Sequence, residues 1–321
     1  QGCCNLLADP ISVEIPWKKW YYDAGRRALP MGDLLRFDNK EVCMMKRKIL
    51  RQIAMILTLV AAVSLSAGGV AAEAPARQPY GVFLGIDNTA MDRLTPYETV
   101  VIDAQYFTAG DILALHEAGH TVYTYLNVGS LEDFRDYYRK WEGICLGEYE
   151  NWEEERWVDV SDAGWQEFMA VTLAGKFVEM GIDGFFVDNC DVYYEYPRDE
   201  IFEGLTAILR GVMGYGKAVI MNSGDTFADE YYSRYGTIAD VFTGINQETI
   251  ITSVDYDNDT FGWQTEEDCA YFKDYVERYS GLGADIYLLE YATDADVIAA
   301  IQSYCGENGF TYYVAESIEL E

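Results

Sequence analysis

Eight short apolar segments recur between residues 80 and 317, and this repetition limits the fold more than any other feature of the chain. Each segment is rich in β-branched and aromatic residues at consecutive positions, which is typical of strands covered on both faces. We therefore expect a parallel sheet with helices on its faces. The segments are residues 80–87, 99–104, 121–129, 184–189, 217–224, 240–248, 285–292 and 310–317.

Helical patterns fill the intervals between these segments. Apolar residues three and four apart occur within residues 205–212, 272–279 and 297–304, and glycines stand near the ends of the helical stretches. Eight strands with intervening helices predict a single (β/α)8 barrel, the TIM-barrel fold of the α/β class, with its active site at the C-terminal ends of the strands. An open doubly wound sheet is the alternative, but no glycine-rich dinucleotide loop follows the first strand.

A different kind of segment precedes the barrel pattern. Residues 44–74 have a basic start, an apolar stretch and small residues at the end, which is the layout of a secretory signal peptide. An uncleaved membrane anchor is the alternative, because no charge occurs between Gln52 and Ala72. We expect residues 1–43 to lie outside the core and the native protein, and residues 75–321 to form the barrel domain. The protein would be secreted, or held at the cell surface if the signal is not cleaved.

The chain is strongly acidic. Its formal net charge is −31, and removal of residues 1–72, which hold six acidic and ten basic residues, makes it about −35. Such a surface repels nucleic acid and anionic membranes and attracts cations. We therefore expect no nucleic-acid partner, and no membrane partner after signal cleavage. Solubility outside the cell or a cationic substrate would each explain the excess of acids.

Four cysteines fall within the barrel domain, at Cys145, Cys190, Cys269 and Cys305. An even number in an exported chain permits two disulfides, with three ways of pairing them. None of the four has the close spacing of a zinc site, and the chain has only two histidines. We expect neither a metal nor another cofactor.

Polar residues follow nearly every apolar segment. In GIDGFFVDNCDVY, residues 181–193, an apolar run leads directly into Asp188 and Asn189. Because the carboxyl ends of barrel strands meet at one rim, these side chains are expected to line one cleft. Any single one is more simply explained as a helix N-cap or turn residue, so the prediction depends on the whole set. The polar residues at strand ends are Asp87, Asn88, Asp103, Tyr125, Asn127, Asp188, Asn189, Asn222, Asn246, Glu248, Glu290, Tyr291 and Glu316.

Carboxylates, amides and aromatic rings together suit a carbohydrate polymer. Glycosidic cleavage needs one carboxyl group to protonate the leaving oxygen and a second to attack or to activate water. Aromatic rings offer flat apolar surface to sugars. His116 and His120 lie on the helix after the second strand, where we expect helix-surface roles, so no Ser-His-Asp arrangement is expected. The loop aromatic residues are Tyr106, Trp152, Trp157, Tyr193, Tyr194 and Trp263.

The interval from residue 129 to residue 162 is too long for a simple connection between a strand and a helix. Its first part, LEDFRDYYRKW, predicts a helix over residues 131–141, and an acidic and aromatic stretch follows. We expect this segment to form a lid or a side wall over the open face of the barrel.

Several motifs, in this order and spacing, resemble glycoside hydrolase family 114, the endo-α-1,4-polygalactosaminidase family of secreted (β/α)8 proteins. The resemblance runs from about residue 80 to residue 316 and is carried by YGVFLG, VVIDAQYF, YLNVGSLEDFR, ERWVDVS, GIDGFFVDNCDVY and LLEYA. It implies a retaining hydrolase for α-1,4-linked galactosamine polymers, with Asp188 as the nucleophile and Glu248 as the acid/base.

The resemblance also implies which residues bind the polysaccharide substrate. Spare acids such as Asp103, Asp191 and Glu290 would pair with the ammonium groups of a deacetylated amino sugar. With the strand-end residues Tyr125 and Asn127, the expected binding residues are Asp103, Tyr125, Asn127, Asn189, Asp191, Tyr193, Asn222, Glu290 and Tyr291. The residues Glu155, Trp157 and Asp159 match a loop motif of the family to which we assign no role.

Two departures from the family pattern concern the site. Thr249 and Ile250 stand where the family has a second acidic residue and a cysteine, and Cys190 replaces a more usual aliphatic residue. A disulfide between Cys145 and Cys190 would tie the long segment to the rim, and two unpaired thiols are the alternative.

Two other functions remain open. One is a non-catalytic carbohydrate-binding protein on the same barrel, and the other is a divalent-metal hydrolase built on Asp103, Asp188 and Asp191. The retaining mechanism requires the carboxyl groups of Asp188 and Glu248 to lie about 5–5.5 Å apart, against about 6.5–9.5 Å for inversion. It also requires a raised pKa for Glu248, which the charge of Asp188 and partial burial would supply.

Overall fold

The computed structural model describes residues 76–321 except residues 151, 257 and 259. The expected upstream segment (1–43) and signal peptide (44–74) therefore lie outside the described residues. Within the described part of the chain, no helix combines the length and the apolar character needed to span a bilayer.

The eight apolar segments form eight parallel strands of one sheet, as predicted, and the fold is a (β/α)8 barrel. Neighbouring strands in space follow one another along the chain without a reversal of order, so the doubly wound alternative is wrong. The strands, in spatial order, are β1 (Gln78–Phe83), β2 (Tyr97–Ile102), β3 (Thr121–Asn127), β7 (Gly184–Asp188), β8 (Ala218–Asn222), β9 (Gly244–Glu248), β12 (Asp285–Tyr291) and β13 (Thr311–Ala315).

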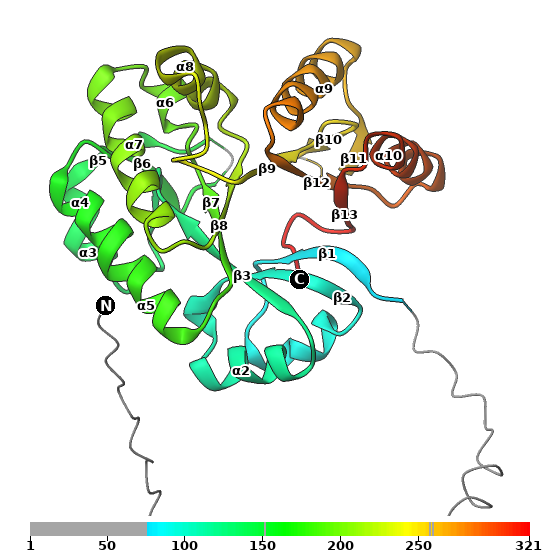
Figure 1. Ribbon diagram of the computed structural model, residues 1–321, viewed down its shortest axis with the longest axis horizontal. Coiled ribbons are helices and arrows are strands. Elements are labelled where there is room, and N and C mark those ends of the chain that lie inside the picture. Colours follow the sequence, from blue (N-terminus) through cyan, green and yellow to red (C-terminus); the bar gives the residue numbers. More distant parts are fainter. Residues whose placement is uncertain (1–75, 151, 257, 259) are drawn as a thin grey trace, which may run out of the picture. The chain divides into compact units, whose positions relative to one another are not determined.

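Helices surround the strands (Figure 1). The predicted apolar stripe of α7 is buried, since Leu205, Ile208, Leu209 and Val212 have no exposed surface. A π-helical stretch, Phe168–Leu173, joins α4 to α5. The helices are α2 (Ala109–Glu117), α3 (Tyr138–Trp141), α4 (Ala163–Glu167), α5 (Ala174–Met180), α6 (Val192–Glu195), α7 (Asp199–Met213), α8 (Asp225–Tyr235), α9 (Glu266–Gly281) and α10 (Ala295–Asn308), with 3₁₀ turns at Asn88–Leu94, Ala104–Tyr106 and Glu142–Ile144.

Aromatic and amide side chains fill the inside of the barrel. The rings of Tyr80 on β1 and Tyr287 on β12 have centroids 4.9 Å apart, although these strands are not neighbours in the sheet. The hydroxyl of Tyr80 donates a hydrogen bond to Asn246 Oδ1 on β9, 3.2 Å away. Both Tyr80 and Asn246 are completely buried. The barrel interior below the strand ends is therefore packed and partly polar.

The barrel is nearly closed between β1 and β13. These two strands lie beside each other, but no ladder of backbone hydrogen bonds joins them within the described residues. The ring of Tyr313 instead packs against Phe83 at 5.5 Å and Tyr97 at 5.6 Å between centroids. Beyond the strands, the backbone N–H of Gly85 donates to the carbonyl of Leu320 at 3.2 Å.

The long segment after β3 forms a small antiparallel sheet of three strands, β4 (Ser130–Glu132), β6 (Glu155–Val158) and β5 (Cys145–Glu148). The predicted helix over residues 131–141 is wrong for its first part, and only α3 is helical. Leu131 and Glu132 pair with β6 instead. Non-local strand pairing therefore overrides the local helical pattern.

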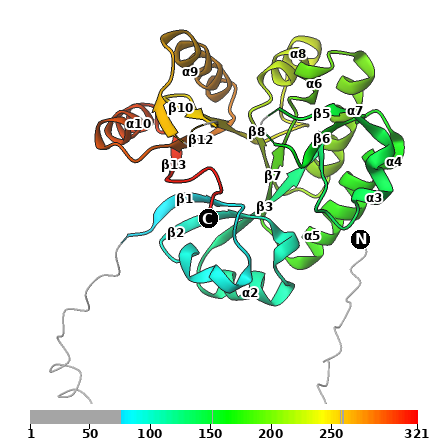
Figure 2. The same ribbon diagram turned by 180° about the vertical axis from the view of Figure 1, so that it is seen from behind.

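A second excursion follows β9. It is a two-stranded hairpin of β10 (Thr252–Asp255) and β11 (Thr260–Trp263), which the apolar pattern does not predict. Seen from behind, β10 lies on the side of α9 and α10, whereas β5 and β6 lie on the side of α4 and α7 (Figure 2). The two excursions thus stand on different sides of the barrel mouth.

Candidate active site

A cavity of about 590 Å³ lies at the C-terminal ends of the strands, where the fold predicts the site. Its walls come from strand ends, from the segment 129–162 and from the hairpin after β9, so the expectation of a side wall is confirmed. The lining is strongly acidic. Within the described residues it contains a single basic side chain, Arg135, and nine acidic ones: Asp103, Glu132, Glu154, Glu155, Asp188, Asp191, Asp225, Glu248 and Glu319.

One amide bridges the two acids that the sequence singles out. Asn222, the last residue of β8, donates from Nδ2 to Asp188 Oδ1 at 2.9 Å and to Glu248 Oε1 at 2.7 Å. These two oxygens are therefore at most about 5.6 Å apart, which is the sum of the two bond lengths. The carboxyl groups face each other across one amide, about sixty positions apart in the chain.

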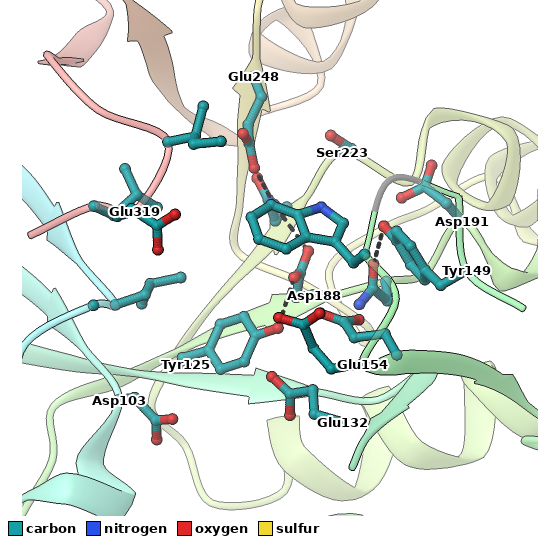
Figure 3. Close-up of a pocket in the computed structure, with 18 of the residues that line it drawn as sticks. Asp103, Tyr125, Glu132, Tyr149, Glu154, Asp188, Asp191, Ser223, Glu248 and Glu319 are labelled. Atoms are coloured by element: carbon teal, nitrogen blue, oxygen red, sulfur yellow. Dashed lines mark hydrogen bonds between the residues drawn. The ribbon is translucent and has the colours of Figure 1, made fainter. Parts of the chain in front are cut away.

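Tyrosine hydroxyls hold the outer oxygens of the same two acids. Tyr125 donates to Asp188 Oδ2 at 3.0 Å, and Tyr291 donates to Glu248 Oε2 at 2.8 Å. Figure 3 shows Asp188 between the phenol ring of Tyr125 and the carboxyl group of Glu248. Both acids are thus fixed by uncharged donors alone.

The backbone turns in the same way after three adjacent strands. The residues that follow Asp188, Asn222 and Glu248 are Asn189, Ser223 and Thr249, with φ of 65°, 53° and 54°. A left-handed conformation is uncommon for residues other than glycine and is a marked outlier for a β-branched residue such as Thr249. Such conformations persist where the surrounding structure requires them, and they gather at functional sites. Here they end each strand abruptly, directly after its polar side chain.

Asn189 belongs to a second polar network beside the acids. Its Nδ2 donates to Asn127 Oδ1 at 3.1 Å and to Ser130 Oγ at 3.0 Å, and its Oδ1 accepts from the hydroxyl of Tyr149 at 3.0 Å. Asn189 lines the cavity, but Asn127 is buried outside the lining. The structure gives no support to the predicted contact of Asn127 with substrate, because its side chain joins β3 to the start of β4.

Burial changes the proton affinity of the acids in the cavity. It raises the pKa of Asp188 and of Glu248, and the bonds from Asn222 oppose both shifts. For Glu248, the charge of Asp188 adds to the rise, as predicted. Burial and the neighbouring acids Asp225 and Asp188 raise the pKa of Asp191 to about 7. Asp191 can therefore carry a proton near neutral pH.

The structure places Glu155, to which the sequence analysis assigns no role, in the cavity wall. It lies on β6, lines the cavity and accepts a hydrogen bond from Ser130 Oγ at 2.5 Å. Burial and the charge of Glu132 raise the pKa of Glu155 to about 8. Asp159 and Trp157, which belong to the same motif, lie outside the cavity lining.

Asp103 is engaged by a cation that the sequence analysis did not single out. Arg135 Nη1 lies 2.5 Å from Asp103 Oδ2, and the same guanidinium donates to both oxygens of Glu132 at 2.5 and 2.8 Å. All three residues are buried. Asp103 lines the cavity as expected, but it is not a spare acid, because its charge is already compensated by Arg135.

Two other expected binding residues face away from the cavity. Glu290 is completely buried and accepts hydrogen bonds from the backbone N–H groups of Ile250, Ile251 and Thr252, so it holds the turn after Glu248. Tyr193 is buried, and its ring packs against the aromatic core beside α6. Neither residue lines the cavity, so the structure gives no support to their predicted contact with substrate.

The cavity also contains side chains that the strand-end argument does not reach. Asp225, at the start of α8, lies near Asp191 and accepts a hydrogen bond from Tyr271. Trp152 and Tyr256, from the two excursions, approach each other with ring centroids 6.4 Å apart. Both excursions carry acidic and aromatic residues, which is the only sequence signal for them.

The cysteines and histidines take structural positions. Cys145, Cys190, Cys269 and Cys305 are all free thiols in the described structure, so the disulfides that their number permits are not formed. His116 Nε2 lies 2.8 Å from Asp183 Oδ2, whereas His120 is buried and its Nδ1 lies 2.8 Å from the carbonyl of Tyr97. The expected surface role is therefore wrong for His120.

The three aspartates of the metal-hydrolase alternative do not form a ligand set. Asp103 is paired with Arg135, and Asp188 is bonded to Tyr125 and Asn222. In the part of the chain that the structure covers, no group of three His, Cys, Asp or Glu side chains has an arrangement suited to a metal ion.

Comparison with known proteins places this site in context. A family model described as "Glycoside-hydrolase family GH114" matches residues 66–318, which is most of the chain. No curated protein sequence matches significantly. The glycoside hydrolase domain of PelA from Pseudomonas aeruginosa has a TM-score of 0.65 at 18% identity, over 75% of this chain and 95% of that chain.

Two further solved structures share the barrel. Ega3 from Aspergillus fumigatus, in complex with galactosamine, has a TM-score of 0.58 at 16% identity, over 77% of this chain and 92% of that chain. The α-galactosidase TtGalA from Thermus thermophilus, in complex with p-nitrophenyl α-D-galactopyranoside, has a TM-score of 0.51 at 11% identity, over 74% of this chain and 58% of that chain. At these identities the structural likeness supports the fold.

Proposed function

Because the chain belongs to glycoside hydrolase family GH114, we propose that it cleaves an amino-sugar polysaccharide of the α-1,4-linked galactosamine type, with retention of configuration. Family membership makes the chain a glycoside hydrolase and so disfavours the non-catalytic alternative. The observation that carries the proposal is the Asn222 bridge. It limits the distance between the facing oxygens of Asp188 and Glu248 to at most about 5.6 Å, which fits the separation of about 5–5.5 Å for retaining enzymes better than the 6.5–9.5 Å for inverting ones.

In the first step, Asp188 attacks the anomeric carbon while protonated Glu248 gives its proton to the departing glycosidic oxygen. The C–O bond to the leaving sugar breaks, and a covalent glycosyl ester forms on Asp188. In the second step, Glu248 takes a proton from water, which attacks the same carbon and releases Asp188. The raised pKa of Glu248 favours the protonated form that the first step requires.

The excess of acidic over basic residues in the cavity lining supports a cationic polymer as the substrate. After Arg135 has compensated Asp103 and Glu132, the acids Glu154, Asp191 and Asp225 remain available along the walls. An ammonium group of a deacetylated amino sugar would form charge-assisted hydrogen bonds with such carboxylates. The crystal structure of Ega3, which shares the barrel fold, is of a complex with galactosamine. A secreted enzyme, as the expected signal peptide would imply, would meet such a polymer outside the cell.

Hydrolysis of partly deacetylated galactosaminan tests the proposal. We expect the wild type to release shorter chains with new reducing ends of α configuration, measured by size-exclusion chromatography and by proton NMR during the first minutes. Glu248→Gln should lose nearly all activity, while Glu148→Gln should keep it, because Glu148 is exposed on β5 outside the cavity lining.

Three results would contradict the proposal. Polymer binding without new reducing ends would indicate the non-catalytic alternative. A first-formed product of β configuration would indicate inversion. Full activity of Glu248→Gln would exclude this residue as the acid/base.

A further inference from the structure

The Asn222 amide can face the two acids in two ways. Its NH2 end donates two hydrogen bonds, whereas its oxygen only accepts. With the NH2 end toward the acids, as in the structure, the amide stabilises both carboxylates. With the oxygen toward them, it would repel ionised Asp188 and would instead accept the proton of Glu248. The acids alone do not hold one orientation, because Glu248 gains and loses a proton in each catalytic cycle.

Two buried residues below the acids form further hydrogen bonds that bear on the orientation of the Asn222 amide. Asn246 Nδ2 donates to Asn222 Oδ1 at 2.7 Å, and the hydroxyl of Tyr80 donates to Asn246 Oδ1 at 3.2 Å. Tyr80 and Asn246 are both completely buried. Neither one lines the cavity, so they act without touching substrate.

The direction of this chain of hydrogen bonds is set at its lower end. In the reversed chain Asn246 would donate to Tyr80, and the phenolic proton would lose Asn246 Oδ1, its acceptor in the described structure. A buried donor without an acceptor is costly. Burial also raises the pKa of Tyr80 well above its usual value, so the phenol keeps that proton at any pH at which the enzyme works.

We propose that Tyr80 and Asn246 are positioning residues that lock the Asn222 amide with its NH2 group toward Asp188 and Glu248 in every protonation state of the cycle. This inference rests on the proposed roles of Asp188 and Glu248. It has a consequence for the proton of Glu248. Because the locked NH2 group can only donate to Oε1, whereas the hydroxyl of Tyr291 beside Oε2 can rotate from donor to acceptor, the proton lies on Oε2.

The test removes one link at a time. Tyr80→Phe deletes only the hydroxyl, and Asn246→Leu deletes the donor to Asn222 at nearly constant volume. Tyr287→Phe is the matched control, because its ring packs against Tyr80 while no hydrogen bond connects it to Asn222 in the described structure. Two quantities are measured for each protein: the carboxyl pKa values of Asp188 and Glu248, from NMR titration of 13C-labelled side chains, and the pH dependence of kcat/KM.

Loss of the lock should raise both carboxyl pKa values, because the amide then donates to the acids for only part of the time. Both limbs of the kcat/KM profile should move to higher pH. We expect kcat to fall about threefold to tenfold in Tyr80→Phe and about tenfold to a hundredfold in Asn246→Leu, consistent with the loss of one positioned hydrogen bond. Tyr287→Phe should stay within about twofold of the wild type, with unchanged carboxyl pKa values.

If Tyr80 and Asn246 had only a structural role, their variants would lose stability and kcat, but the carboxyl pKa values of Asp188 and Glu248 would not change. Unchanged carboxyl pKa values in both folded variants, checked by near-UV circular dichroism, would overturn the inference. If the wild type hydrolyses no amino-sugar polymer, the proposed function fails, yet the NMR titration still decides whether Tyr80 and Asn246 orient the amide.

Discussion

Two pairs of acids face the same cavity but are held by different kinds of partner. Asp188 and Glu248 receive hydrogen bonds from uncharged groups, the amide of Asn222 and two tyrosine hydroxyls. Asp103 and Glu132 instead share the guanidinium of Arg135. Figure 3 places Asp103 and Glu132 on one side of the cavity and Glu248 on another.

The difference separates reactive acids from structural ones. Uncharged donors orient a carboxyl group but compensate its charge only partly, so burial still raises the pKa of Asp188 and of Glu248. Burial raises the pKa of Glu132 as well, but there the hydrogen bonds and charge of Arg135 oppose the rise. An acid beside a permanent cation is poorly suited to exchange protons or to form an ester. The comparison therefore supports the chemistry proposed for the first pair and suits the second pair to a structural part in the cavity wall.

The largest expected effect concerns the first pair. Asp188→Asn should lower kcat by at least about a thousandfold, because the nucleophile is lost. The free energy of unfolding should stay the same or rise, since a buried acid without a cation is replaced by a neutral amide. Initial rates on galactosaminan and urea unfolding measure the two effects. A variant that is active, or that loses more than about 2 kcal/mol of stability, would break the comparison.

The second pair should show the opposite behaviour. Arg135→Met leaves Asp103 and Glu132 buried without a cation and should lower the free energy of unfolding by about 3–5 kcal/mol. Arg139→Met is the control, because the Arg139–Glu142 pair at 3.0 Å is exposed and should contribute less than about 1 kcal/mol. Urea unfolding of both variants gives the difference. Equal free energies of unfolding for the two variants would mean that Arg135 does not stabilise the cavity wall.

Glu155 sharpens the comparison, because uncharged side chains, above all the hydroxyl of Ser130, hydrogen-bond to this acid. Its pKa of about 8 in the folded state lies above the ordinary value of 4.5, so the folded protein holds a proton that the unfolded chain releases. This contribution to stability is present below about pH 4.5 and is lost as the pH rises toward 8. Glu155→Gln should therefore gain about 1–3 kcal/mol relative to the wild type between pH 4 and pH 8.

Urea unfolding at several pH values measures this effect, with the exposed neighbour Glu154 changed to Gln as the matched control. Parallel pH curves for the wild type and Glu155→Gln would show that Glu155 is ionised in the folded state.

The smallest expected effect concerns Glu154, Asp191 and Asp225, acids of the cavity that neither Asn222 nor Arg135 contacts. If they bind ammonium groups, KM for galactosaminan should rise about twofold to fivefold between 0.05 and 0.5 M sodium chloride, because salt screens partly exposed charges. The value of kcat should change little, since the buried reacting pair is shielded from the salt. Initial-rate kinetics at constant pH decide this. A KM that is independent of salt would indicate a neutral sugar polymer.

The barrel strands could be predicted because a strand covered on both faces must be apolar at consecutive positions. Asp188 and Glu248 could be placed at the rim for the same reason, since each ends such a strand. Sequence reasoning could also show that Glu290 and Tyr291 do not both reach the cavity. Neighbouring residues on a strand point to opposite faces, so only one of the two can reach the cavity.

The remaining features depend on contacts between distant residues. The spacing of Glu132 and Arg135 suits a helix, but their partner Asp103 comes from the end of β2, and no local pattern encodes that approach. The chain from Tyr80 through Asn246 to Asn222 depends on which strands face each other across the barrel. Sequence periodicity identifies the strands but does not determine these pairs across the interior.

The missing ladder between β1 and β13 bears on how the enzyme could accommodate a bulky polymer. Ring stacking tolerates small separations better than a row of backbone hydrogen bonds, so this seam is where the wall yields at the lowest cost. The strands that bear Asp188 and Asn222, β7 and β8, occupy the middle of the sheet order, as far from the seam as the topology allows. A displacement of β13 at this seam would thus leave the hydrogen bond between Asn222 on β8 and Asp188 on β7 undisturbed.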